Sequence, residues 1–336
     1  MLVYIYPGGL NLVKKSGVGE AIFHQKEMLE AAGVNVTLQW SNDADVVHLN
    51  TTFPDSCRMA HYAHSKGKSV IYYGHSTMED FRNSFTGSNT LAPLFQKWII
   101  HCYSMGDIVI TPTEYSRSLL QSYGIKRPIF NLSNGIDTIL FSYNEKRREA
   151  FRNYWGLNSQ QKAVLSVGHF IERKGILDYI DLARRMPDVR FFWFGHTEDW
   201  LVPSQIRKAI KNTPPNLTWA GYVPSDRLCD AYCGCDLFDF MSYEETEGIV
   251  VLEALACHIP VIVRDIPVYG GWLENGVNVW KAKDDAEFFQ KTKSILSGEL
   301  PDLTEKGHEV AENRSISKVG KRLLEIYEAL PKVRHE

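Results

Sequence analysis

Short runs of β-branched and aromatic residues alternate with segments of helical length along almost the whole chain. The runs that predict strands are 2–6, 34–40, 46–49, 70–73, 108–111, 129–132, 163–167, 189–194, 217–220, 237–241 and 260–263. The segments that predict helices between and after them are 20–32, 56–65, 91–103, 116–123, 176–185, 228–235, 249–255 and 315–329. Such alternation favours parallel sheets covered by helices on both faces, whose ligands gather beyond the carboxyl ends of the strands.

A chain of 336 residues is too long for one ordinary hydrophobic core, so two α/β domains are expected. Lys and Arg (37) nearly balance Asp and Glu (40), which argues against nucleic acid as the main partner. No apolar run is long enough to span a membrane, and the N-terminus resembles a first strand rather than a signal peptide.

Six cysteines are scattered along the chain, and only Cys229, Cys233 and Cys235 are close together in sequence. Because no complete metal-ligand pattern accompanies them, we expect small core residues in a reduced cytoplasmic setting and no metal. Asp43-Ala44-Asp45 has the form of an Asp-x-Asp metal motif, but its place just before a strand indicates a solvated turn.

The segment Tyr243–Glu253 passes from an acidic loop to an apolar helix. Gly248 permits a tight turn, and the first amides of the helix lack intrahelical partners, so this arrangement suits a phosphate. Glu245 and Glu253 would repel a phosphate, which suggests that they accept hydrogen bonds from hydroxyl groups on either side of it. On spacing alone, a solvated acidic loop and a helix-surface glutamate are the simpler interpretation.

A second strand-to-helix turn carries adjacent cations. Residues 163–167 lead into Gly168–Gly175, where Arg173 and Lys174 could neutralise a diphosphate leaving group. Two exposed cations at a helix start are the alternative.

These features together resemble glycosyltransferase family 4, a family of retaining enzymes with the GT-B fold. The resemblance rests on Glu245 and Glu253 with Gly248 between them, on the ALA and PVIV that follow, on Lys174-Gly175 and on NGID at 134–137. The chain departs from the pattern at His169, where the family usually has an arginine. The fold implied is two Rossmann-like domains with a cleft between them: 1–144 for the acceptor, 145–315 for a nucleotide sugar, and 316–336 as a last helix crossing back.

The resemblance also implies roles for individual residues. Glu245 would orient the sugar hydroxyls, Glu253 the ribose and His75 the far side of the sugar, while Arg173 and Lys174 stabilise the leaving diphosphate. The positions expected at the UDP-sugar donor are Gly17, Gly221, Tyr222, Val223, Thr246, Glu247, Gly248, Ile249, Val250 and Glu253. Those expected at the acceptor are Gly19, Asn50 and Thr51. No cofactor and no protein nucleophile are implied.

Four short sequence segments narrow the choice of acceptor. YGHSTMEDFRNSF, LAPLFQKWI, DIVITPTEYS and EETEGIVVLEALA resemble bacterial glycosyl-diacylglycerol synthases that add a second hexose to glucosyl-diacylglycerol. That resemblance implies transfer of glucose or galactose from a UDP-sugar by a peripheral protein on the inner face of the cell membrane. The helix 91–103 or the basic segment 145–155 could meet lipid, although core packing and a solvated helix are the simpler interpretations.

Two other functions stay open at this point. A transferase for surface polysaccharide would use a polyprenyl-linked or soluble acceptor with the same donor site. A non-catalytic nucleotide-sugar-binding scaffold is the alternative from another class.

Overall fold

A computed structural model describes residues 1–9, 17–328 and 330 of the chain. The chain divides into two compact units, each treated separately below. Unit 1 comprises Met1–Phe81, Thr90–Gly135 and the C-terminal segment from Arg314, and unit 2 comprises Arg82–Asn89 and Ile136–Asn313.

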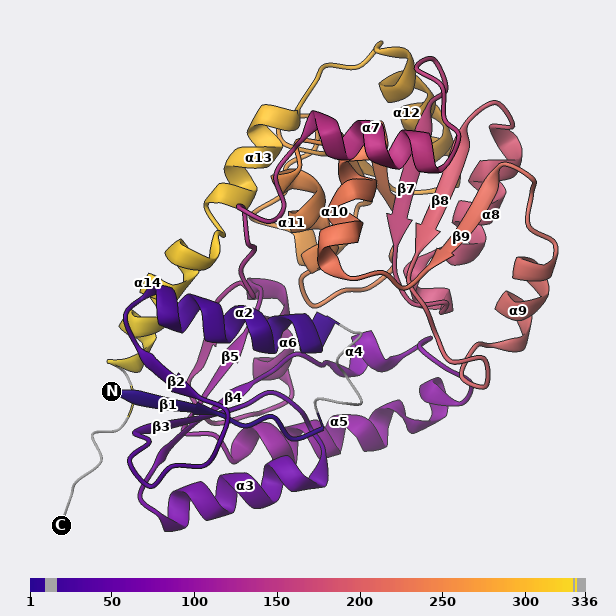
Figure 1. The fold of residues 1–336 in the computed structure, drawn as a ribbon. Helices are drawn as coiled ribbons and strands as arrows, with labels where there is room; N and C mark the ends of the chain where they lie inside the picture. Colours follow the sequence, from indigo (N-terminus) through magenta and orange to yellow (C-terminus); the bar gives the residue numbers. More distant parts are fainter. Residues whose placement is uncertain (10–16, 329, 331–336) are drawn as a thin grey trace. The chain divides into compact units, whose positions relative to one another are not determined.

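Unit 1 is built on a six-stranded parallel sheet in the order β2-β1-β3-β4-β5-β6 (Figure 1). Its strands are β1 (Leu2–Ile5), β2 (Asn35–Thr37), β3 (Val46–Leu49), β4 (Ser69–Tyr73), β5 (Ile108–Thr111) and β6 (Ile129–Asn131). Its helices are α2 (Gly17–Ala31), α3 (Pro54–Ser65), α4 (Met78–Phe81), α5 (Ser88–Ser104, which starts in unit 2), α6 (Glu114–Ser122) and α14 (Ile316–Tyr327). The chain leaves β1 for β2 on one side and returns to β3 on the other, so β1 and β3 form the switch point of this sheet.

Unit 2 has a second six-stranded parallel sheet, in the order β12-β11-β10-β7-β8-β9. Its strands are β7 (Ala163–Val167), β8 (Arg190–Phe194), β9 (Leu217–Gly221), β10 (Leu237–Phe240), β11 (Val261–Arg264) and β12 (Trp280–Ala282). Its helices are α7 (Glu145–Tyr154), α8 (Ile176–Arg185), α9 (Ser204–Lys211), α10 (Ser225–Gly234), α11 (Ile249–Ala256), α12 (Asp285–Ser297) and α13 (Thr304–Glu312), with short 3₁₀ turns at Glu172–Lys174 and Pro267–Tyr269. The neighbouring strands β7 and β10 form its switch point.

The central strands are buried on both faces, which explains their nearly continuous apolar sequences. All five residues of β4 and all five of β7 are buried. In unit 1 the two faces of the sheet pack into separate apolar clusters, one with α2 and α14 and the other with α3 and α5. The last helix approaches α2 closely, because a Cβ on Gly320 would lie 2.3 Å from the carbonyl oxygen of Met28.

The predicted strands and helices are all present in the described residues, with boundaries shifted by a few positions. The largest difference is β2, which is only three residues long where the sequence predicts 34–40. The elements α4, α9, α12, α13 and β12 carry no prediction. The helices α9 and α13 are only 8 and 9 residues long, too short for an apolar repeat to extend over several turns.

Candidate active site

The switch point of unit 2 brings two distant segments together. The segment after β7 supplies Lys174, and the segment after β10 supplies Glu245. Lys174 Nζ donates to Glu245 Oε1 at 2.5 Å, and Ser242 Oγ donates to the same oxygen at 2.6 Å. The lysine ammonium also lies 5.2 Å from the centre of the Phe240 ring, an apolar wall on one side of the pair. Two of the residues predicted for the leaving group and the sugar are therefore direct partners.

Glu245 is ionised although it is buried. Burial opposes ionisation, but the charges of Lys174 and Arg173 and the hydrogen bonds from Lys174 and Ser242 outweigh it and hold the pKa of Glu245 below its usual value. An ionised carboxylate is an acceptor only, so Glu245 can receive hydrogen bonds from hydroxyl groups but cannot act as an acid.

Arg173 is the second cation of this group, and it is as buried as the lysine. Its Nη1 lies 3.6 Å from Glu245 Oε1 and donates to the carbonyl oxygen of Glu244 at 2.5 Å. Its Nε lies 3.4 Å from Ser84 Oγ, and its backbone N–H donates to Asn83. The segment Arg82–Asn89 thus belongs to unit 2 and contacts Arg173, although the sequence predicts all of residues 1–144 in the first domain.

Two glycines set the backbone around the ion pair. Gly175 has φ 72°, and a Cβ there would lie 2.4 Å from the carbonyl oxygen of Met241, so only glycine allows the segments after β7 and β10 to touch. Gly248 has φ 88° and is the N-cap of α11, whose first amides face no partner within the helix. The turn predicted at Gly248 is present, and it puts a helix N-terminus just after Glu245.

His169 is the position where the family pattern has an arginine. Burial lowers the pKa of His169, and the neighbouring Lys174 and Arg173 lower it further, so the ring is neutral. Its Nδ1 lies 2.7 Å from the carbonyl oxygen of His196, which requires the proton on Nδ1. His169 therefore does not supply the positive charge that the arginine of the family pattern carries. The nearby Arg173 carries a positive charge instead.

A glycine follows or ends each of the strands β7, β8 and β9. Gly168, directly after β7, donates its backbone N–H to the carbonyl oxygen of Phe194 at the end of β8. Gly195, directly after β8, donates its N–H to the carbonyl oxygen of Gly221 at the end of β9. A Cβ on Gly195 would lie 2.1 Å from the carbonyl oxygen of Gly168. These contacts draw the carboxyl ends of β7, β8 and β9 into one bare backbone edge, at which Tyr222 is 42% exposed and Val223 is half-buried.

Glu253, predicted to hold a ribose, is buried inside α11. The hydroxyl of Tyr232 on α10 lies 2.7 Å from Glu253 Oε2 and 3.1 Å from the carbonyl oxygen of Val250. The tyrosine therefore fixes the carboxylate relative to the first turn of its helix. Close to it, Thr246 and Ile249 are half-buried and Glu247 is buried.

In unit 1, a polar cluster occupies the carboxyl ends of β3 and β4. His75 Nε2 lies 2.9 Å from Asn50 Oδ1, and Asn50 exchanges two side-chain hydrogen bonds with Gln25 of α2, at 2.6 and 3.0 Å. Burial lowers the pKa of His75 to about 4, so the imidazole is neutral. Thr51 Oγ1 lies 2.7 Å from Ser56 Oγ and 3.2 Å from the carbonyl oxygen of Gly8.

The two glycines predicted in the first loop, Gly17 and Gly19, both belong to α2. Gly17 is the first residue of α2 and Gly19 is buried two residues later. The loop positions at 10–16 lie outside the described residues. His75 and Asn50, which were predicted separately, are thus brought into contact, whereas Gly17 and Gly19 belong to a helix rather than to a free loop.

Comparison with known proteins decides the family. A family model described as Glycosyltransferase Family 4 matches residues 16–140, and one described as Glycosyl transferases group 1 matches residues 147–314. The processive diacylglycerol alpha-glucosyltransferase of Acholeplasma laidlawii is 40% identical over 335 residues, covering 99% of this chain and 100% of that protein. The chain belongs to glycosyltransferase family 4.

Further relatives agree with this family. The glycosyltransferase is 29% identical over 178 residues to the alpha-galactosylglucosyldiacylglycerol synthase of Streptococcus pneumoniae, covering 52% of this chain and 47% of that one. Among solved structures, Anabaena Alr3699/HepE in complex with UDP-glucose superposes with a TM-score of 0.80 at 15% identity, covering 98% of this chain and 99% of that one. Sucrose-phosphate synthase from Thermosynechococcus elongatus gives 0.81 at 15% identity, with 98% of each chain covered. The predicted GT-B fold, two Rossmann-like domains, is therefore confirmed.

Three residues of the candidate site carry no prediction from the sequence. Ser242 lies two residues after the end of β10 and just before the acidic loop, a position at which polar side chains often belong to a site. Tyr232 lies in an apolar stretch that resembles core, and Ser84 lies far from Arg173 in sequence. No local pattern in the sequence links either of them to the site.

Proposed function

We propose that this glycosyltransferase transfers glucose from UDP-glucose to a diacylglycerol-based acceptor, glucosyl-diacylglycerol, with retention of anomeric configuration. The observation that carries the proposal is the buried cluster of Lys174, Arg173 and ionised Glu245 beside the N-terminus of α11. A sugar diphosphate requires positive charge and free amide groups for its phosphates, and a carboxylate that accepts hydrogen bonds from its sugar hydroxyl groups. The name of the Acholeplasma relative supports glucose and a diacylglycerol lipid, and the UDP-glucose complex of the Anabaena neighbour supports the donor class.

The proposed reaction breaks the bond between the anomeric carbon and the β-phosphate oxygen. Lys174, Arg173 and the amides that begin α11 stabilise the negative charge that grows on the departing diphosphate. The acceptor hydroxyl attacks on the same face, and its proton passes to an oxygen of the leaving phosphate. Glu245 accepts hydrogen bonds from the sugar hydroxyls, and Glu253, oriented by Tyr232, accepts from the ribose.

The roles proposed for unit 1 follow from the family resemblance. Neutral His75 would contact the donor sugar, with Gln25 and Asn50 holding its ring in place. Asn50, Thr51 and Gly19 would belong to the acceptor site. Because Arg173 and Lys174 supply the positive charge, we propose a reaction that needs no metal, so activity should persist in a chelator.

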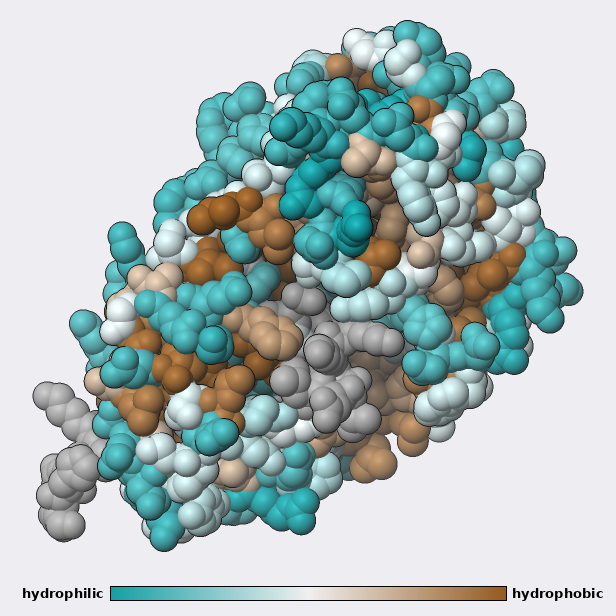
Figure 2. Space-filling model, viewed as in Figure 1, coloured by the Kyte–Doolittle hydropathy of each residue, from teal (hydrophilic) through white to brown (hydrophobic). Residues whose placement is uncertain are grey.

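We also propose peripheral contact with the cytoplasmic face of the membrane. None of the helices in the described part of the chain is long and apolar enough to cross a bilayer. On α5, Leu91 and Leu94 are 47% and 66% exposed, although Ile99 is buried in the core. Figure 2 shows that apolar side chains also reach the surface of unit 1 around α2, where Phe23 is 37% exposed. These side chains could enter the interface of a bilayer.

The basic helix α7 does not offer its arginines to lipid. Arg147 binds Asp230 at 2.7 Å, and Arg148 binds Asp236 at 2.7 Å. Arg152 is buried and donates to backbone carbonyls within unit 2. Of the four cations in segment 145–155, three are thus held by partners within unit 2 and only Lys146 is left, so this segment is poorly suited to bind anionic lipid. We therefore propose α5 as the membrane-contacting helix.

The test is a donor and acceptor panel. UDP-glucose, UDP-galactose and GDP-mannose are each offered with vesicles containing diacylglycerol or glucosyl-diacylglycerol, and the anomeric configuration of the product is read by NMR. We expect α-linked glucolipid from UDP-glucose, with and without EDTA. Transfer only to a polyprenyl-linked or soluble acceptor would assign the chain to polysaccharide synthesis instead. Tight UDP-glucose binding with no transfer to any acceptor would favour a scaffold.

Membrane contact has its own test. Leu94→Ser should lower co-sedimentation with anionic vesicles, because it removes the most exposed apolar side chain of α5. Ile139→Ser is the matched control, since Ile139 is 89% exposed but lies in unit 2. Equal sedimentation of L94S and the unaltered protein would remove α5 from the proposal.

A further inference from the structure

Three buried thiols converge in unit 2, away from the cation group. Cys229 and Cys233 lie one turn apart on α10, and Cys257 directly follows the last residue of α11. Their sulfur atoms all lie within 4.8 Å of one another, and Cys229 Sγ is 3.8 Å from Cys257 Sγ. Proximity along the sequence groups Cys235 with the first two, but the third member of the cluster is Cys257.

The spacing of the sulfurs fits a shared ion. Three sulfurs bound at about 2.3 Å to one ion, at the corners of a triangle, are about 4.0 Å apart. The observed spacing is close to this value, whereas a disulfide requires an S–S distance of about 2.05 Å. The three thiols can therefore surround an ion with small movements.

A cation and backbone carbonyl groups surround the thiols. Cys229 Sγ lies 3.2 Å from the carbonyl oxygen of Leu140, and Cys233 Sγ lies 3.6 Å from that of Ser142, so both thiols are hydrogen-bonded while no ion is bound. Arg147 is held close to the cluster through its ion pair with Asp230 on α10. A metal ion would add to this positive potential and displace the remaining thiol protons.

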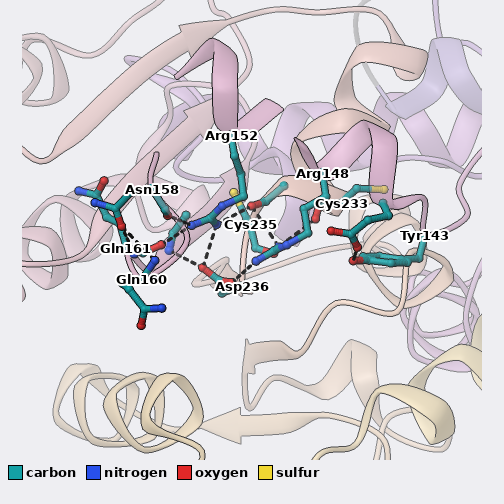
Figure 3. A network of polar contacts seen from close by, with 12 residues as sticks. Tyr143, Arg148, Arg152, Asn158, Gln160, Gln161, Cys233, Cys235 and Asp236 are labelled. Carbon is teal, nitrogen blue, oxygen red and sulfur yellow. Dashed lines mark hydrogen bonds and ion pairs between the residues drawn. The ribbon is translucent and has the colours of Figure 1, made fainter. Parts of the chain in front are cut away.

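The frame that carries Cys233 is firmly held (Figure 3). Arg148 donates to the carbonyl oxygens of Cys233, Gly234 and Cys235, at 3.1 to 3.2 Å, and also binds Asp236. Arg152 donates to the Gly234 carbonyl from the next turn of α7. The end of α10 is thus fixed independently of the thiols, as a metal site requires of its ligands.

A cavity lies beside two of the three cysteines. It has a volume of about 350 Å³ and is lined by Cys233 and Cys257 but not by Cys229, together with Tyr143, His258 and Leu300. A volume of this size can hold a water molecule next to the cluster. Cys235 also lines this cavity but does not belong to the thiol cluster.

We propose that Cys229, Cys233 and Cys257 form a three-thiolate site for one thiophilic d¹⁰ metal ion such as Zn²⁺. Three soft sulfur ligands select such an ion over Mg²⁺ or Ca²⁺, which prefer oxygen. The cluster follows the C-terminal end of α11, about 12 Å along an eight-residue helix from Gly248. The site therefore ties α10 to α11 as a structural element and takes no part in the transfer.

The experiment uses the full chain, reduced and freed of metal. Cd²⁺ and Zn²⁺ are titrated separately, with the thiolate-to-cadmium ultraviolet absorption band and the thermal midpoint as readouts. We expect one equivalent bound with a raised midpoint, and about 100-fold weaker binding in Cys257→Ser. Cys235→Ser is the matched control, because Cys235 is equally buried and lines the same cavity, and it should bind like the unaltered chain.

Several results would overturn the proposal. These are the absence of a cadmium band, equal binding by C257S, or equal loss in C235S. Circular dichroism of each metal-free variant establishes folding, and Cys229→Ala replaces C257S if the latter is unfolded. A protein two mass units lighter without reductant, together with no cadmium band, would indicate a disulfide instead. Glucosyl transfer can fail without affecting any of these readouts, so the two proposals are tested separately.

Discussion

Lys174 Nζ lies 2.5 Å from Glu245 Oε1, and this ion pair joins the segments that follow β7 and β10 at the switch point of the unit 2 sheet. Both side chains are mostly buried, with 13% and 8% of their surfaces exposed. A buried pair is costly to break, because the partner that remains is a charge without compensation. The pair therefore couples the local fold to the proposed chemistry.

Lys174→Met should damage both stability and turnover. Without the ammonium, burial raises the pKa of Glu245, and the leaving diphosphate loses its closest predicted cation. We expect a loss of about 3 kcal/mol in the free energy of unfolding and a fall in kcat of about 100- to 1,000-fold. Urea unfolding and initial rates with UDP-glucose measure the two effects.

Lys208→Met is the control for that change, since Lys208 is exposed on α9. It should leave stability and turnover within experimental error of the unaltered enzyme. Adding Glu245→Gln to K174M should restore part of the stability, because the buried charge is then removed. A double variant no more stable than K174M would show that the two residues are not coupled.

Tyr232→Phe should weaken donor binding more than it slows transfer. The change removes the hydroxyl that lies 2.7 Å from Glu253 Oε2, so the carboxylate proposed for the ribose loses its orientation. We expect KM for UDP-glucose to rise about tenfold with kcat nearly unchanged, and a stability loss of about 1–3 kcal/mol. Tyr179→Phe is the matched control, because that buried hydroxyl donates to the carbonyl oxygens of Val164 and Phe192, in the core of unit 2. Tyr179→Phe should lower the free energy of unfolding by a similar amount and leave KM for UDP-glucose unaltered. A rise in KM in both variants would mean that the loss of any buried hydroxyl in unit 2 weakens donor binding, and not the loss of the contact with Glu253.

Gly175→Ala tests whether the contact between the two segments needs glycine. Alanine at φ 72° costs about 1–2 kcal/mol by itself. Its Cβ would also meet the Met241 carbonyl oxygen at 2.4 Å, and the shift required would move the chain that leads to Glu245. We expect a loss of more than 3 kcal/mol together with loss of activity. Gly298→Ala, at φ 75° with open space around it, should show the backbone cost alone. Equal effects of the two changes on unfolding by urea would contradict the argument.

The sequence was sufficient for the strand and helix pattern because parallel strands are apolar on both faces and the helices between them are periodic. Local pattern marked Glu245, Lys174 and Gly248 as candidates near strand ends or a helix start, but it was the family resemblance that grouped them in one site. Which partners they would take was not predictable. The contact of Arg173 with Ser84 and that of Tyr232 with Glu253 depend on tertiary packing, for which local sequence carries no signal.

The thiols illustrate the same limit. Cys229 and Cys233 are four positions apart on a predicted helix, so their proximity could be read from the sequence. Cys257 reaches them only because α11 packs beside α10, whereas Cys235, closer in sequence, lies beyond the last residue of α10. Proximity along the chain therefore indicated the wrong third cysteine.

Asp239 makes stability depend on pH. This residue of β10 is fully buried, and Thr292 Oγ1 donates to its Oδ2 at 3.2 Å. Burial raises the pKa of Asp239 to about 8, and the charge of Asp178 adds to this although Arg264 opposes it. Between about pH 4 and pH 8 the folded protein keeps a proton that the unfolded chain has released. This group therefore lowers stability progressively as pH rises through that window, and its contribution is constant above about pH 8.

Asp239→Asn should abolish that slope, because the amide keeps the shape of the protonated acid and does not titrate. Urea unfolding at pH 5, 6, 7 and 8 measures it. Relative to D239N, the unaltered protein should lose up to about 1.4 kcal/mol per pH unit across the window. Asp188→Asn, at an exposed position, controls for the change in net charge and should keep the original slope. Parallel pH profiles for D239N and the unaltered protein would mean that Asp239 is ionised in the fold, and that the positive charge of Arg264 outweighs the cost of burying the carboxylate.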